Sequence, residues 1–102
     1  MQDFPEDVLA TIQYTIVERF IQDFKQCTKE ARYSLSLSKM EITSNAHRFS
    51  LDHLYDLSYK PFTNGQGFLY LHTNQGVFSF VVSSNPETFI RAYQMISSKK
   101  HL

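Results

Sequence analysis

The order of apolar and polar residues predicts a helix at each end of the chain, with strands between them. From residue 6 to residue 28, apolar side chains recur every three or four positions, which is typical of an amphipathic helix. The apolar stripe contains Leu9, Ile12, Ile16, Phe20 and Phe24, and it is widened by Val8, Val17, Ile21 and Cys27. No Gly or Pro interrupts it. We therefore predict a long N-terminal helix over 6–28.

The segment 32–82 has the alternation that is typical of strands. Tyr33, Leu35 and Leu37 are separated by polar residues, which indicates a strand with one buried face. Further short apolar runs, separated by turn residues, bring the expected number to about six strands. Because consecutive strands with short loops pair antiparallel, we expect a meander that forms a curved sheet or a partial barrel. The longest loop is predicted over 60–67.

The most definite pattern lies between residues 67 and 98. Two apolar runs flank the turn sequence 73–76, which predicts a hairpin. Asn85 and Pro86 then suit the cap and the first position of a helix over 85–98. Its apolar stripe should pack on the sheet. The chain is therefore expected to form one α+β domain, residues 1–102.

Composition limits the classes of function. The chain has 102 residues, of which 42% are hydrophobic, so a core can form. Ten Lys and Arg balance ten Asp and Glu, whereas nucleic-acid binders carry a basic excess, which argues against a nucleic-acid partner. The single Cys27 excludes an internal disulfide. The acidic N-terminus is unlike a signal peptide, and no apolar run reaches the roughly 20 residues of a membrane span. We expect a cytoplasmic protein.

The sequence contains no pattern that predicts catalysis, a metal site or a cofactor. His47, His53, His72 and His101 are not spaced as zinc ligands are. Cys27 lies on the apolar side of the predicted helix, where a structural role is expected. The one Gly-x-Gly step precedes a strand, whereas a phosphate-binding loop precedes a helix. We predict that the protein is not an enzyme.

Two surfaces are candidates for binding a partner. Tyr55, Tyr59 and Phe62, with Lys60 among them, are predicted to form an exposed aromatic patch suited to a protein. The stripe of the predicted N-terminal helix is longer than a small sheet can cover. Val17 and Ile21 are therefore expected to contact a partner, either a second copy of the chain or another protein.

Several segments between about residue 33 and residue 96 resemble the bacterial pleckstrin-homology-like domains. The similar segments are Met40-Glu41-Ile42-Thr43, the run from Phe49 to Leu54, the turn 73–76 and the helix start 84–90. The resemblance implies a partly open barrel plugged by the C-terminal helix, which binds or scaffolds and has no catalytic residues. The predicted N-terminal helix lies outside the usual core of that family.

We accordingly expect a non-enzymatic protein-interaction or scaffolding module, of bacterial origin. A small-ligand-binding or enzymatic α+β domain, with a cavity between helix and sheet, is the first alternative. The second is a weak lipid-surface binder that uses Lys39, Arg48 and Lys60. Phosphoinositide-binding relatives cluster basic residues in an early strand loop, and the sparse basic residues here argue against lipid. A deep polar pocket favours the first alternative, and a basic rim the second.

Overall fold

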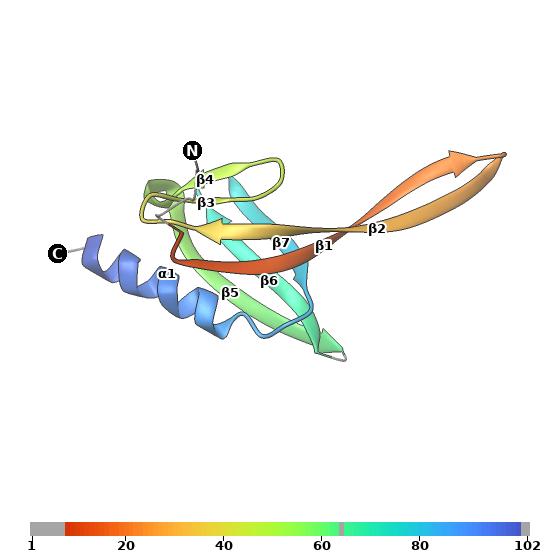
Figure 1. The fold of residues 1–102 in the computed structure, drawn as a ribbon. Helices are drawn as coiled ribbons and strands as arrows, with labels where there is room; N and C mark the ends of the chain where they lie inside the picture. Colours follow the sequence, from red (N-terminus) through yellow and green to blue (C-terminus); the bar gives the residue numbers. More distant parts are fainter. Residues whose placement is uncertain (1–7, 64, 101–102) are drawn as a thin grey trace, which may run out of the picture.

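The computed structural model describes residues 8–63 and 65–100, which form one antiparallel sheet and one helix at its end (Figure 1). Neighbouring strands follow the order β4-β3-β2-β1-β7-β6-β5. The strands are β1 (Ala10–Gln22), β2 (Lys25–Leu37), β3 (Glu41–Thr43), β4 (Arg48–Ser50), β5 (Leu54–Thr63), β6 (Gln66–Thr73) and β7 (Gly76–Val82). A short 3-10 helix, η1 (Leu51–His53), links β4 to β5, and α1 (Glu87–Lys100) follows β7.

The predicted N-terminal helix over 6–28 is wrong. Within the described part of that range, the chain forms β1, a tight turn and the start of β2, while residues 6 and 7 lie outside the described residues. The helical spacing of the apolar residues coincides with an alternation at residues 12–16, Ile-Gln-Tyr-Thr-Ile. This stretch is also rich in the β-branched and aromatic residues that favour strands. The described part of the chain is therefore mainly a sheet with a single α-helix, and the strand count rises because β1 joins the sheet.

The turn between β1 and β2 is formed by Asp23 and Phe24. Both have positive φ, 54° and 65°, and Gln22 pairs with Lys25 on either side of them. Two left-handed residues in a two-residue loop give the turn whose twist matches a hairpin. Asp tolerates that conformation, but a bulky Phe does not adopt it readily, and strain of this kind is on the order of 1–3 kcal/mol.

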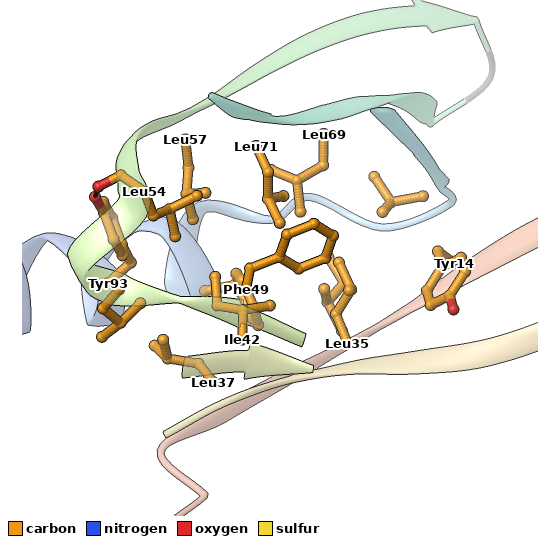
Figure 2. Close-up of a cluster of buried hydrophobic side chains, with 14 residues drawn as sticks. Tyr14, Leu35, Leu37, Ile42, Phe49, Leu54, Leu57, Leu69, Leu71 and Tyr93 are labelled. Atoms are coloured by element: carbon orange, nitrogen blue, oxygen red, sulfur yellow. Dashed lines mark hydrogen bonds between the residues drawn. The ribbon is translucent and has the colours of Figure 1, made fainter. Parts of the chain in front are cut away.

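The core lies inside the curve of the sheet, and α1 covers one end of it (Figure 2). Leu35, Leu37, Ile42, Leu69 and Leu71 are completely buried there. These residues come from strands on both sides of β1, so the two halves of the sheet face each other across one apolar interior.

The predicted C-terminal helix over 85–98 is present as α1. The side-chain oxygen of Asn85 accepts a hydrogen bond of 2.9 Å from the N–H of Glu87, as expected of a capping residue. Phe89 and Tyr93 are both buried in the core. The hydroxyl of Tyr93 donates to the carbonyl of Leu54 at 3.1 Å, which ties α1 to the start of β5.

Replacing Phe89 with Ala should lower the free energy of unfolding by about 3–5 kcal/mol, because the change leaves a cavity under α1. Urea titration measures the loss. Met95→Ala, on the exposed side of the same helix, is the control and should change stability by less than about 0.5 kcal/mol. Equal small losses in the two variants would show that α1 does not seal the core.

Candidate interaction surfaces

The most conspicuous surface is an arm formed by residues 16–31, which we define as the distal parts of β1 and β2 with their turn. These strands pair continuously from Ala10 and Leu37 out to Gln22 and Lys25. In contrast, β1 pairs with β7 only through Tyr14 and Thr15. The two strands therefore leave the sheet as a ribbon (Figure 1), which accounts for the 57 Å longest dimension. Seven residues per strand at about 3.3 Å give an arm of roughly 23 Å.

The arm carries apolar side chains on both of its faces. Ile16 and Phe20 continue the core-side face of β1, and between them Glu18 forms an ion pair of 3.7 Å with Lys29. Val17 and Ile21 lie on the opposite face, because successive strand residues alternate. Large exposed fractions are found for Ile16 (37%), Phe20 (39%), Val17 (53%), Ile21 (77%) and Phe24 (102%). Of these side chains, Val17, Ile21 and Phe24 are more than half exposed in the described chain.

A recess opens where β1 separates from β7, at the base of the arm. Its volume is about 250 Å³, and its lining is mainly apolar. Tyr14 and Phe80 meet edge to face at 4.9 Å between ring centres, and Phe49 and Phe78 do so at 5.0 Å. Figure 2 shows Tyr14 at the end of the buried cluster from which β1 continues into the arm.

The wall of the recess opposite the strands is the turn between β3 and β4. The hydroxyl of Tyr14 accepts a hydrogen bond of 2.9 Å from the N–H of Asn45. His47 in the same turn stacks on Phe49, with 5.9 Å between ring centres. These contacts fix the turn against the sheet, so the recess is a formed feature of the surface.

The aromatic patch predicted on β5 is divided between different environments. The predicted loop over 60–67 is wrong. Residues 60–63 belong to β5, and Gly67 of β6 pairs with Pro61 of β5. Tyr59 lies opposite the buried Leu69 and packs against the core. Tyr55 is 67% exposed, at an irregularity near the other end of β5.

The other face of β5 and β6 carries a row of aromatic rings. Phe62 lies at a register shift and contacts Phe68, with 4.8 Å between ring centres. Tyr70 and then His72 continue the row, and Lys60 pairs with Phe68 across the strands. Of the predicted patch, Lys60 and Phe62 therefore lie together on this face, while Tyr59 turns away from them.

The described residues contain few groups arranged for chemistry. No cluster of three or more His, Cys, Asp or Glu lies among them, and His101 is outside them. The Ser58 hydroxyl lies 2.7 Å from Nε2 of His72, a pairing that supports catalysis only with a third orienting group. Asp56 is opposite His72, but its Oδ1 accepts a hydrogen bond from the N–H of Leu57 at 2.8 Å.

A second recess, of about 440 Å³, lies between β1 and the start of α1. Gln13, Asn85 and Thr88 are among its polar lining residues, and the described lining includes no acidic, basic or sulfhydryl group. It can offer hydrogen bonds to a ligand but no general acid or base.

No family model, curated protein or solved structure matches the chain. Among the described residues, no helix is long and apolar enough to cross a bilayer.

Sequence reasoning predicted exposed apolar side chains at Val17 and Ile21, which are exposed on the arm, but missed the tip and the recess. Phe24 was assigned to a helix stripe, although Gln22-Asp23-Phe24-Lys25 carries Asp at a position typical of a turn. Phe78 and Phe80 were recognised only as strand residues. Their contribution to the recess depends on where β1 leaves β7, and no local pattern indicates that point.

Gly67→Ala should destabilise the protein by about 1–3 kcal/mol through overpacking. An added Cβ would lie 2.5 Å from Cε1 of Tyr59 and 2.8 Å from both the Lys60 carbonyl oxygen and the Pro61 Cα. Urea unfolding measures the effect, with Ser79→Ala on the exposed side of β7 as the control. Unchanged stability of Gly67→Ala would show that Tyr59 is not held against β6.

Proposed function

We propose that the protein is a non-enzymatic protein-interaction module whose binding element is the arm. The supporting observation is that the arm exposes five large apolar side chains, one of them wholly exposed at its tip. A two-stranded hairpin is at best marginally stable alone in water. Apolar groups gathered on such a projection are therefore expected to be covered by a partner.

We also propose that the resemblance to the bacterial pleckstrin-homology-like domains extends over the strands and α1. Seven antiparallel strands in the described chain, followed by a helix that covers the core, support it. A binding or scaffolding role in the bacterial cytoplasm is part of this proposal. The unpaired Cys27 is compatible with a reducing compartment.

The alternatives have less support. For a small-ligand or enzymatic domain, the recess beside α1 lacks the acid and base groups that catalysis needs. For a lipid-surface binder, the basic residues are dispersed. Arg48 forms an ion pair with Glu41 at 3.4 Å, while Lys60 on β5 lies opposite Phe68 on β6. Neither arrangement provides a basic rim.

Ile21→Lys tests the proposal, because the side chain is 77% exposed and its replacement should change stability by less than about 0.5 kcal/mol. Burying the new charge against an apolar partner is costly, so binding should be lost. The measurement is co-purification: the tagged chain is isolated from bacterial extract together with the partner bound to it. That partner can be an untagged second copy of the chain. The partner is then purified and its binding to the arm reconstituted.

Gln75→Lys, in the exposed turn between β6 and β7, is the matched control and should keep the partner. If the two variants retain the same partners with the same affinity, the arm is not the binding element.

A further inference from the structure

We propose that the partner of the arm is a second copy of the chain, joined edge to edge through β1, with Phe24 of each copy seated in the recess of the other. This inference rests on the arm being the binding element. To that proposed function it adds the identity of the partner, the register in which the two β1 strands pair and the role of the recess.

The first observation is the free edge of β1. Its residues 16–22 are hydrogen-bonded to β2 on one side and to no strand of the described chain on the other. Unpaired strand edges accept another strand by main-chain hydrogen bonding. The corresponding edge of β2 carries Lys25, Lys29 and Glu30, and such charges oppose strand addition. The β1 edge, with its four apolar side chains, is therefore the one suited to pairing.

The second observation is that charge selects one register. A two-fold axis pairs β1 with itself in antiparallel fashion about a central residue, and the longest overlaps are centred on Glu18, Arg19 or Phe20. The first two bring identical charges directly opposite each other, which destabilises a strand pair. A centre at Phe20 instead places one aromatic ring against its symmetry mate.

The neighbours of Phe20 also suit this register. Arg19 then lies opposite Ile21 of the second copy, and Glu18 lies opposite Gln22. Each Arg19 lies on a diagonal of the second Arg19, and the Asp23 carboxylate in the turn that follows Gln22 of the second copy offsets the repulsion.

The third observation connects the tip to the recess. In this register Gln22, the last residue of β1, comes opposite Glu18 of the other copy. The turn that carries Phe24 extends past this pair toward Ile16 of the other copy, and Ile16 lines the recess. The recess holds about 250 Å³, and an apolar cavity of roughly 150 Å³ already accepts benzene. The recess is therefore large enough to accept a phenyl ring.

The conformation of Phe24 agrees with a docking role. Phe24 has a φ of 65° and is wholly exposed, so no other side chain of the described residues packs against its ring. Gly would satisfy the turn without strain. A strained, exposed aromatic residue at the tip is explained if its ring is buried on assembly.

Light scattering over a wide range of concentration, with the full chain, is the first test. A concentration-dependent mass rising from one chain to two is expected. Phe24→Gly should weaken dimerisation by about tenfold or more, as loss of an interface anchor does. The same variant should leave the monomer at least as stable, because Gly suits the positive φ. Met95→Ser, an exposed apolar position on α1, is the control and should dimerise normally.

Cross-linking tests the register. In a Cys27→Ser background, Phe20→Cys should form a disulfide between copies under mild oxidation, because directly opposed strand residues lie within disulfide reach. Glu18→Cys in the same background should cross-link poorly. Efficient cross-linking at residue 18 instead of residue 20, or a dimer that Phe24→Gly does not weaken, would overturn the proposed contact.

The outcomes distinguish a failure of the proposed homodimer from a failure of the proposed binding function of the arm. A constant mass of one chain excludes the second copy. If Ile21→Lys then still abolishes capture and reconstituted binding of another protein, the arm remains the binding element and its occupant is that protein. If neither assembly depends on the arm, both inferences fail.

Discussion

The pairing of β1 with β2 is the interaction on which the rest of the structure depends. Its inner part places Ile12 opposite Leu35, and both side chains are buried in the core. The same register continues without interruption to Gln22 and Lys25, beyond any other strand of the described chain. One hairpin therefore completes the apolar interior at its base and presents an apolar surface at its tip. A slip of one residue would exchange the two faces, so core and arm are fixed together.

The sequence allowed much of the interior to be predicted but not the arm. The hairpin from β6 to β7 and the helix α1 carry strong local signals, because a turn sequence and a capped start are encoded by adjacent residues. β1 lacked such signals: its apolar residues fit both periods, and the absence of Gly and Pro favoured a helix. What selects the strand is the second strand, whose alternating Tyr33, Leu35 and Leu37 need a neighbour on which to pair. That requirement is non-local, and the β-branched and aromatic residues of β1 agree with it.

The candidate surfaces also divide into features that the sequence predicts and features that depend on strand register. Exposed apolar positions at Val17 and Ile21 were predicted, although on a helix, because an excess of apolar residues is visible in any secondary structure. The position of Tyr59, by contrast, depends on strand register. It lies opposite Leu69 and turns inward, while Lys60, one residue later, turns outward. A segment interpreted as a loop has no such alternation, so its aromatic residues could not be assigned to faces.

The separation of β1 from β7 is a property of the sheet as a whole. After Tyr14 and Thr15, hydrogen bonding between these strands stops, although each strand continues. Closing that gap within one chain would pair the edges and fill the recess, but it would also bury the arm and leave no projecting surface. Among the described residues, the open gap leaves two unpaired strand edges beside an apolar hollow, an arrangement that natural sheets otherwise avoid. A surface strand that is both unpaired and apolar is consistent with a sheet completed by association.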